Sequence, residues 1–278
     1  MGKPMARNLK RAGADVVVHN RSQAPMEELA AEGMRVAATP AETAMRSDTV
    51  ITMLTDTPAL EKVIAGKSGI LEAAGPDTLV IDMSTAKMLA TKDLAARIKK
   101  CGGAYVDAPV SGGTMGAKQG TMSIMVGGDE SALARAMPIL KVLGGKVTHV
   151  GGIGAGQVVK AANQVIVGLT ICAVAEALVL AKHAGVDPAK VRKALGGGFA
   201  DSKILEVHGQ RMIEDSFLPG ARSTVQRKDM DQALELAATL GIELPATSLS
   251  RDLYDNLIAM GHGDLDHAAL IKAIDPDV

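Results

Sequence analysis

The sequence is poor in aromatic residues and has no excess of charge of either sign. Of its 278 residues, two are Phe, two are Tyr and none is Trp, which leaves no platform on which nucleic-acid bases could stack. Thirty Lys and Arg residues nearly balance 31 Asp and Glu residues, for a formal net charge of −1. This balance argues against a nucleic acid or an anionic membrane as a partner.

Cysteines and long apolar runs are also scarce. Cys101 and Cys172 lie far apart without CxxC spacing, which is typical of reduced thiols in a cytoplasm. The longest apolar run, Val165–Ala175, is interrupted by Thr170 and is too short to span a bilayer. No signal peptide precedes the predicted fold. We therefore expect a soluble, cytoplasmic protein.

The first half of the chain alternates short strand-like runs with helical ones. Six runs are predicted strands: Asp15–His19, Thr49–Leu54, Thr78–Met83, Ala104–Asp107, Met122–Val126 and Val147–Val150. Five are predicted helices: Pro4–Ala12, Met26–Glu32, Pro58–Ile64, Met88–Lys100 and Glu130–Val142. This alternation predicts a mostly parallel, doubly wound α/β sheet.

After Val150 only helices are predicted. They are Gln157–Ala184, Pro188–Leu195, Ser202–Glu214, Thr224–Leu240, Ala246–Met260 and Asp266–Ile274. We therefore predict two domains, a Rossmann-like α/β domain over residues 1–152 and an all-helical domain over 153–278. The first long helix is expected to bridge them.

The chain opens as a helix, because Pro4 follows Met1-Gly2-Lys3 at a position typical of a first helical turn. A nucleotide-binding βαβ unit needs a strand and two glycines before that point. We expect roughly ten residues with this strand to lie upstream, since strands average about 5–6 residues. Without them, the neighbouring strands lose a pairing partner.

The end of the second strand of this unit bears on cofactor choice. An NAD-selective fold carries a carboxylate there, whereas this chain has Asn20, followed by Arg21 and Ser22. Loss of the carboxylate removes repulsion of a 2′-phosphate, and a guanidinium can bind phosphate with two hydrogen bonds. NADP is therefore favoured over NAD. The alternative interpretation is an ordinary polar turn.

Ser111, Gly112 and Gly113 follow a predicted strand. The backbone N–H groups of a glycine turn, together with a serine hydroxyl, can bind a small carboxylate, although a purely structural turn has the same pattern. Lys228-Asp229, on a later helix, could reach the site or be a surface ion pair.

Lys160 begins the longest helix and shares one helical face with Asn163 and Gln164. Val165–Leu180 is apolar nearly all round, so this helix is expected to be buried. Burial lowers the pKa of a lysine and suits it to proton transfer near neutral pH. The alternative is a lysine whose charge reaches solvent from the helix end.

The segment Gly261–His267 is rich in histidine and aspartate, residue types that bind metal ions. It lacks the pair of histidines four residues apart that a helical zinc site uses, and Asp266 is better explained as the N-cap of the last helix. We expect no metal.

Six segments, in this order and spacing, resemble the β-hydroxyacid dehydrogenase family, which includes 3-hydroxyisobutyrate dehydrogenase and 2-hydroxy-3-oxopropionate (tartronate semialdehyde) reductase. They are Met1–Met5, Ile81–Thr85, Asp107–Gly113, Gly120–Gly128, Gly154–Asn163 and Lys228–Met230. The resemblance runs from Met1 to about Ile274. It implies a Rossmann domain, a helical domain, an active site between them, and a homodimer or homotetramer built through the helical domain.

The resemblance also implies residue roles. Lys160 corresponds to the catalytic acid and base, Ser111, Gly112 and Gly113 to the substrate carboxylate site, and the amides of Asn163 and Gln164 to contacts with the substrate hydroxyl. The implied cofactor residues, taken with those argued above, are Met1, Gly2, Asn20, Arg21, Ser22, Leu54, Thr55, Thr85 and Lys228.

The implied reaction interconverts a small 3-hydroxy acid and its semialdehyde with NADP(H). Gly196–Ser202, His208–Met212 and Gly261–His267 look closer to the tartronate semialdehyde reductase branch than to 3-hydroxyisobutyrate dehydrogenase, which is the alternative. Gln164, where many members have a second asparagine, leaves substrate choice open. Imine reductases of related architecture generally lack the lysine. A catalytically idle NADP-binding scaffold is the rival from another class.

Overall fold

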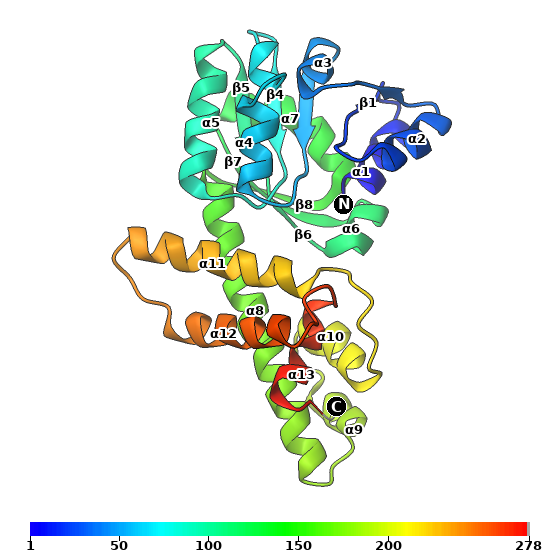
Figure 1. The fold of residues 1–278 in the computed structure, drawn as a ribbon, viewed down its shortest axis with the longest axis vertical. Coiled ribbons are helices and arrows are strands. Elements are labelled where there is room, and N and C mark those ends of the chain that lie inside the picture. Colours follow the sequence, from blue (N-terminus) through cyan, green and yellow to red (C-terminus); the bar gives the residue numbers. More distant parts are fainter. Residues whose placement is uncertain (277–278) are drawn as a thin grey trace. The chain divides into compact units, whose positions relative to one another are not determined.

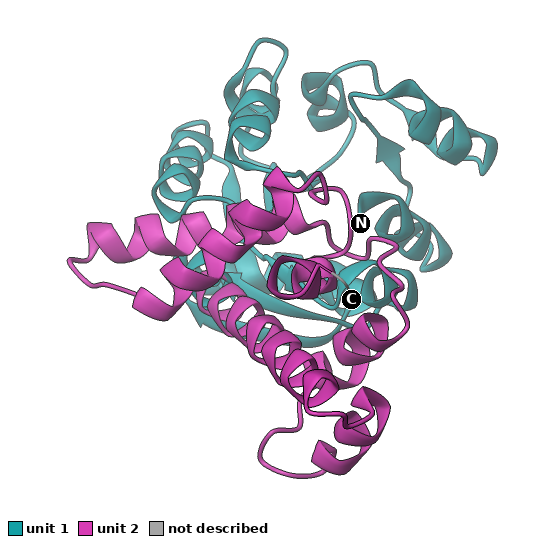
Figure 2. Ribbon diagram, turned by 60° about the horizontal axis from the view of Figure 1, so that its bottom comes forward, with its two compact units in different colours: residues 1–160 teal, residues 161–278 magenta. Residues whose placement is uncertain are grey.

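The structure is a computed structural model that describes residues 1–276, and its contacts divide the chain into two compact units, Met1–Lys160 and Ala161–Val278 (Figure 2). The first unit is an α/β domain and the described part of the second is helical, as predicted (Figure 1). The division falls after Lys160, inside helix α8 (Ala155–His183), because this helix begins in the first unit and continues into the second.

The main sheet of the first unit has strand order β3-β4-β5-β7-β6, and β8 pairs with β7. Its strands are β3 (Thr49–Thr52), β4 (Leu79–Asp82), β5 (Ala104–Asp107), β6 (Val110–Ser111), β7 (Met122–Gly127) and β8 (Gly144–Gly151). The β3, β4 and β5 strands are parallel, as are β7 and β8, whereas β7 runs antiparallel to β5 and β6.

Two short strands form a separate parallel sheet, β1 (Val17–Val18) with β2 (Arg35–Val36). The β2 and β6 strands were not predicted, because each contains only two residues and has no readable alternation.

Helices cover both faces of the main sheet (Figure 1). They are α1 (Gly2–Arg11), α2 (Gln23–Ala31), α3 (Pro40–Met45), α4 (Thr57–Ala65), η1 (Ile70–Glu72), α5 (Met88–Lys100), α6 (Gly113–Gln119) and α7 (Glu130–Leu143). Leu79 and Ile81 pack into a core with Leu140 of α7, whereas Val80 packs into a second core with Leu94 of α5. This alternation follows from the two-residue period of a strand and confirms the doubly wound prediction.

The second unit comprises the rest of α8 and the helices that follow it. These are α9 (Pro188–Leu195), α10 (Lys203–Ile213), α11 (Ser223–Thr239), α12 (Pro245–Ala259), η2 (His267–Leu270) and α13 (Ile271–Ile274). Gly168 on α8 lets α11 approach, since a Cβ there would lie 2.7 Å from the sulfur of Met230. The six helical segments predicted after Val150 are all present.

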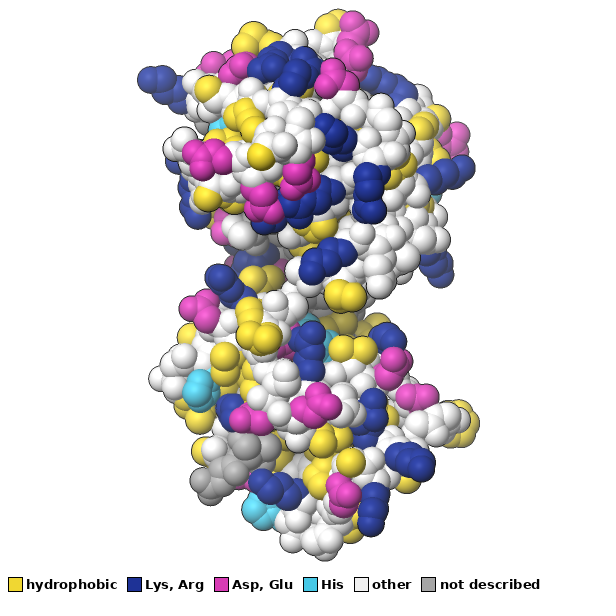
Figure 3. All heavy atoms as spheres, turned by 90° about the vertical axis from the view of Figure 1, so that its right-hand side faces the viewer, with side chains coloured by type: hydrophobic (Ala, Val, Ile, Leu, Met, Phe, Trp, Pro, Cys, Tyr) yellow, Lys and Arg dark blue, Asp and Glu magenta, His cyan; other side chains and the backbone are white. Residues whose placement is uncertain are grey.

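Helix α8 is long and apolar enough to cross a membrane by length and composition, which the sequence prediction did not anticipate. Only 33% of its most apolar window is buried in this chain, so the expectation that the whole helix is buried is wrong for the chain alone. A core helix of a soluble protein has the same composition, so this property is weak evidence of a membrane span. On the face drawn in Figure 3, positive and negative side chains are intermixed, in keeping with the balanced composition.

The start of α8 is fixed by a buried carboxylate at the end of β5. The backbone N–H of Gly154 donates to Oδ1 of Asp107 at 2.7 Å, and that of Gln157 donates to Oδ2 at 3.0 Å. A negative charge is stabilising at this end of a helix. Burial raises the pKa of Asp107, and these backbone hydrogen bonds act against that rise.

Two glycines make room for this carboxylate. A Cβ on Gly127 would lie 2.6 Å from Oδ1 of Asp107, and one on Gly156 would lie 2.7 Å from Oδ2. The glycine-rich segment before α8 therefore packs closely against the end of β5.

The side chain of Gln157 holds α8 from a second direction. Its amide nitrogen donates to the backbone oxygen of Ser84 at 2.9 Å, and its amide oxygen accepts from the N–H of Ala86 at 3.0 Å. The first turn of α8 is thus bonded to the segments that follow both β4 and β5. Lys160 lies one turn beyond these contacts.

A second buried carboxyl, Asp82, links the ends of β3 and β4. Its Oδ1 accepts from the hydroxyl of Thr52 at 2.8 Å and from the N–H of Ser84 at 3.0 Å. The Ser84 hydroxyl oxygen in turn accepts from the N–H of Leu54 at 3.0 Å. Burial raises the pKa of Asp82 from 3.8 to about 6, although the hydrogen bonds from Ser84 and Thr52 act to lower it.

Asp82→Asn is expected to remove a pH dependence of stability. Between about pH 4 and pH 6 the unfolded chain has released this proton while the folded chain retains it, so the free energy of unfolding falls as pH rises, by about 3 kcal/mol in total. Asparagine keeps the accepting oxygen and cannot ionise. Urea denaturation should therefore show that the free energy of unfolding of the variant, compared with that of wild type, becomes more favourable to the variant as pH rises from about 4 to about 6.

Asp77→Asn, which changes an exposed carboxyl of the same unit, is the control and should track the wild type at every pH. If the free energy of unfolding of Asp82→Asn changed with pH as that of wild type does, the group that binds this proton would not be Asp82.

Candidate active site

The structure places Met1 and Gly2 at the beginning of α1, where Met1 is the N-cap and Gly2 the first helical residue. Helix α1 is tied to α2 by an ion pair of 2.6 Å between Lys3 and Glu28 and by contacts of Arg7 with both Glu28 and Glu32. Helix N-termini present unpaired N–H groups to anions. The role of Met1 and Gly2 in cofactor binding remains a prediction.

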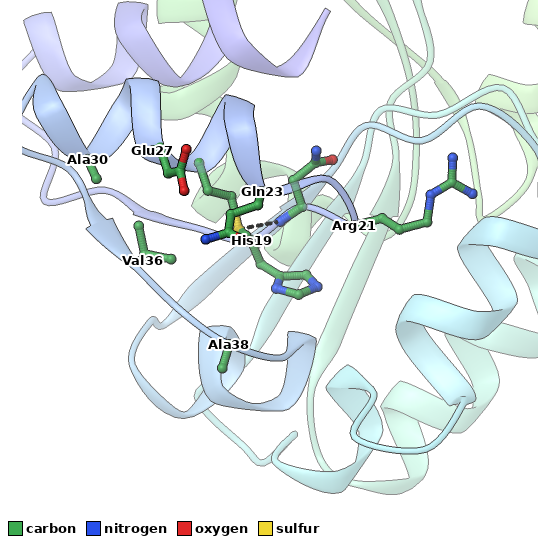
Figure 4. A pocket seen from close by; sticks show the side chains of 9 residues that line it. His19, Arg21, Gln23, Glu27, Ala30, Val36 and Ala38 are labelled. Carbon is green, nitrogen blue, oxygen red and sulfur yellow. Dashed lines mark hydrogen bonds between the residues drawn. The ribbon is translucent and has the colours of Figure 1, made fainter.

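A pocket of about 400 Å³ opens beside β1 and β2, and it contains two of the predicted cofactor residues. It is lined by His19, Asn20, Arg21, Gln23, Met26, Glu27, Ala30, Val36 and Ala38 (Figure 4). Ser22 is not among these residues and instead occupies the N-cap of α2. Such a turn at the end of a strand fits the ribose of a nucleotide.

The pocket residues differ in what they could bind. The backbone N–H of Asn20 points to the sulfur of Met26 at 3.2 Å, which fixes the turn, and the Arg21 side chain extends away from the other labelled side chains in Figure 4. The N–H at Nδ1 of His19 donates to the backbone oxygen of Ala37 at 3.1 Å. The sequence prediction did not include Glu27, because the contribution of α2 to the pocket depends on its packing beside β2. It also did not include His19, the residue before Asn20.

Three of the predicted cofactor residues, Leu54, Thr55 and Thr85, follow the neighbouring parallel strands β3 and β4. The hydrogen bond between Leu54 and Ser84 joins these two segments directly. Thr55 donates to the carboxylate of Asp56 at 3.0 Å, and Asp56 caps α4. The structure thus brings Leu54 and Thr85 to one edge of the sheet. The connecting residues Asp82 and Ser84 were not singled out as site residues in the sequence.

Ser111 ends β6, and Gly112 and Gly113 turn the chain into α6. Both glycines have positive φ angles, 131° and 58°, which side chains rarely adopt. A Cβ on Gly113 would meet no heavy atom within 4 Å, so the turn faces open space. A short helix after the turn was not predicted. The geometry leaves the backbone approachable by a small anion.

Lys160 is buried, with 7% of its surface exposed. It belongs to the same compact unit as the Ser111 turn and the pocket beside β1. The predicted burial is therefore confirmed, and its position one turn after the anchored start of α8 limits the movement of its backbone. Its role in proton transfer remains a prediction.

Asn163 and Gln164 lie one turn further along α8, in the second unit. The amide of Gln164 is bound by α11, donating to the carboxylate of Asp229 at 2.7 Å, and the amide of Asn163 donates to Gln164 at 2.7 Å. Lys228 forms an ion pair with Asp229 at 2.8 Å. The sequence did not reveal that these four residues form one network, because α11 lies more than 60 residues away.

Asp266 is fully buried and caps η2, as predicted, accepting from the N–H of Ala268 at 3.1 Å. Burial alone would raise its pKa, but hydrogen bonding from His208 and the charges of His267 and Arg211 hold that pKa well below its usual range.

His208, Asp266 and His267 offer possible metal-ligand atoms within 4.8 Å of one another, a grouping that the sequence did not suggest. The Asp266 carboxylate already accepts from Gly220 at 2.8 Å and is paired with the guanidinium of Arg211. A nearby positive charge opposes a cation, so we interpret the cluster as an anchor for the loop before α11.

Two family models together match nearly the whole chain. The first, the NAD binding domain of 6-phosphogluconate dehydrogenase, matches residues 1–151. The second, described as the NAD-binding region of NADP-dependent 3-hydroxyisobutyrate dehydrogenase, matches residues 154–274.

Relatives match over the same length. The chain is 45% identical to 2-hydroxy-3-oxopropionate reductase of Escherichia coli, covering 99% of this chain and 94% of that protein. It is 35% identical to 2-(hydroxymethyl)glutarate dehydrogenase of Eubacterium barkeri, covering 98% and 91%. A solved structure of Mycobacterium tuberculosis 3-hydroxyisobutyrate dehydrogenase with L-serine superposes with a TM-score of 0.90 at 33% identity, covering 99% and 96%.

These matches extend over both units and agree with the fold and with the order of the six segments. The protein is thus an oxidoreductase with a nicotinamide-cofactor-binding domain, and it belongs to the β-hydroxyacid dehydrogenase family.

Proposed function

We propose that this enzyme is an NADP(H)-dependent reductase of 2-hydroxy-3-oxopropionate (tartronate semialdehyde). The observation that carries the proposal is the buried Lys160, set one turn into a helix whose start is bonded to the carboxyl edge of the sheet. The 45% identity to a reductase of this substrate supports the choice of acid. The alternative is that the enzyme is a 3-hydroxyisobutyrate dehydrogenase, which the 33% identical solved structure supports.

The residues of this chain supply binding and proton transfer. Backbone N–H groups of Gly112 and Gly113 and the hydroxyl of Ser111 hold the substrate carboxylate, which orients the aldehyde. The bound nicotinamide supplies the hydride that reduces the carbonyl carbon. The Lys160 ammonium gives a proton to the carbonyl oxygen, so that an alcohol forms and the amine regains its proton from solvent. In the oxidative direction the neutral amine accepts the hydroxyl proton.

Arg21 supports NADP, because it lines the pocket beside β1 and a guanidinium can bind a 2′-phosphate with two hydrogen bonds. Glu27 lines the same pocket, and a carboxylate there could instead accept from ribose hydroxyls. NAD is therefore the second candidate cofactor. We propose NADP because the residue at the end of β1 is Asn20 rather than an acid.

The purified enzyme with NADPH should reduce tartronate semialdehyde with a higher kcat/KM than methylmalonate or succinate semialdehyde. Lys160→Ala is expected to lower kcat by about 10²–10⁴-fold, because the proton donor is lost. NADPH affinity, measured by fluorescence titration, should remain within a few-fold of wild type.

Lys182→Ala, on the exposed end of the same helix, is the matched control and should keep kcat. A near-normal kcat in Lys160→Ala would sink the assignment of the proton donor. Cofactor binding by the wild type without turnover of any semialdehyde would instead favour the idle scaffold.

Arg21→Ala should raise the KM for NADPH at least about tenfold, because a charge-assisted contact to phosphate is lost, while the KM for NADH changes little. Initial rates with both cofactors at a fixed semialdehyde concentration provide the measurement. Arg35→Ala is the control, since Arg35 is paired with Asp15 and is not a pocket residue. Equal increases for the two cofactors would remove the argument for NADP.

We also propose that the enzyme is a homodimer or homotetramer. Apolar side chains of α8 remain exposed in the chain, including Ile166 at 66% and Leu180 at 72%, and a second copy could cover them. Light scattering should give two or four times the chain mass, and Ile166→Glu should reduce it. Leu89→Glu, which changes an exposed leucine on α5, should not. A monomeric wild type contradicts the proposal.

A further inference from the structure

A buried network of side chains joins α8 to α11 within the second unit. Gln164, Gln226 and Asp229 are each at least nine-tenths buried. The amide nitrogen of Gln164 donates to Oδ2 of Asp229 at 2.7 Å and to the amide oxygen of Gln226 at 3.1 Å. Buried amides must find partners of the right type, so the direction of each hydrogen bond here has consequences.

The direction is set by Asp229. An ionised carboxylate only accepts hydrogen bonds, so the group of Gln164 that faces it must be the N–H₂. Turning that amide over would place its carbonyl oxygen against the carboxylate. The same carboxylate pairs with the ammonium of Lys228 at 2.8 Å, so that both of its named partners on this side are donors.

Gln226 fixes the same direction independently. Its own amide nitrogen donates to the backbone oxygen of Gln164 at 3.1 Å, and a backbone carbonyl can only accept. The amide oxygen of Gln226 must therefore face the amide nitrogen of Gln164. The Asp229 carboxylate and the Gln226 amide oxygen both accept from the Gln164 amide nitrogen, and together they hold this amide in one orientation.

The orientation of the Gln164 amide in turn determines that of Asn163. With its nitrogen turned to α11, Gln164 presents its amide oxygen to Asn163, whose amide nitrogen donates to it at 2.7 Å. The carbonyl oxygen of Asn163 is consequently the accepting end of the chain of amides. Asn163 is half-buried and follows Lys160 by three residues, on the same helical face.

We propose that Asp229 is a positioning residue that makes Asn163 a hydrogen-bond acceptor for the hydroxyl on C2 of the substrate. The site then favours a 2-hydroxy semialdehyde over one with a methyl group at C2, because only the hydroxyl can donate. This inference rests on the proposed function. It also gives a reason for Gln164, since an asparagine is shorter by one carbon–carbon bond, about 1.5 Å, and would not span to Asp229.

Asp229→Asn tests the proposal, because an asparagine can present either oxygen or nitrogen to Gln164. The measured quantity is the ratio of kcat/KM for tartronate semialdehyde to that for methylmalonate semialdehyde. We expect the ratio to fall roughly 3–10-fold, the equivalent of one weakened hydrogen bond, since Gln226 still restrains Gln164. Changes in cofactor binding through Lys228 affect both substrates and cancel in the ratio.

Asp231→Asn is the matched control. It removes a carboxylate from the same helix that pairs with Arg227 and Arg251 and is not bonded to Gln164. The ratio should stay at the wild-type value. An equal loss of kcat/KM on both substrates in Asp229→Asn would show a merely structural role and overturn the proposal, as would an unchanged ratio.

A spectroscopic readout does not depend on turnover. In protein labelled with ¹⁵N at glutamine side chains, the resonance of Gln164 is identified by its absence in Gln164→Asn. In Asp229→Asn this resonance should move upfield, because a charge-assisted hydrogen bond has become a neutral one. An unmoved resonance rejects the role of Asp229.

Two further outcomes are distinguishable. If Asp229→Asn does not fold by circular dichroism, Gln164→Asn replaces it, since it keeps an amide that is too short to reach α11, and the same fall in the ratio is expected. If the wild type reduces no semialdehyde, the proposed function fails and the substrate role of Asn163 fails with it. The resonance of Gln164 still decides whether Asp229 orients the amides.

Discussion

The Asp107 carboxylate binds the first turn of α8, and the position of the buried lysine depends on that interaction. It accepts two backbone N–H groups at the point where the sheet ends and the longest helix of the chain begins. Gln157 adds two hydrogen bonds to the segment after β4. Because four hydrogen bonds from two directions fix one helical turn, Lys160 is held by the backbone rather than by a flexible loop. Preorganisation of this type limits the cost of reaching a reactive geometry.

The features predicted correctly from sequence are those with a strong local signal. The β3, β4 and β5 strands and α5 have clear periodicity and were located within one or two residues. The β2 and β6 strands lack such a signal because they contain two residues each. The start of α6 at Gly113 was interpreted as a turn, since two successive glycines usually oppose a helix and only their positive φ angles allow this one to begin.

The candidate site could be predicted only in part, again because only some of its residues have a local signal in the sequence. Lys160, Ser111 and Arg21 stand out because their residue types are unusual for their local positions. Asp107, Asp82 and Asp229 are equally important to the geometry, yet each acts through partners that are 2 to 65 residues away in sequence. Nothing in their immediate surroundings distinguishes them from ordinary strand-end or helical aspartates. Their function is visible only when the hydrogen-bond partners are known.

Because α8 is one uninterrupted helix, it carries both Lys160 and the adjacent amides of Asn163 and Gln164, which are bonded to different partners. The amine is secured by the strand ends of the α/β unit, and the amides are secured by α11 of the helical unit. Under the proposed function, substitutions at Asp229 of α11 would alter which acid is accepted while the position of Lys160 stays fixed by Asp107 and Gln157. If that proposal holds, a member of this family could acquire a new substrate by changes on one helix.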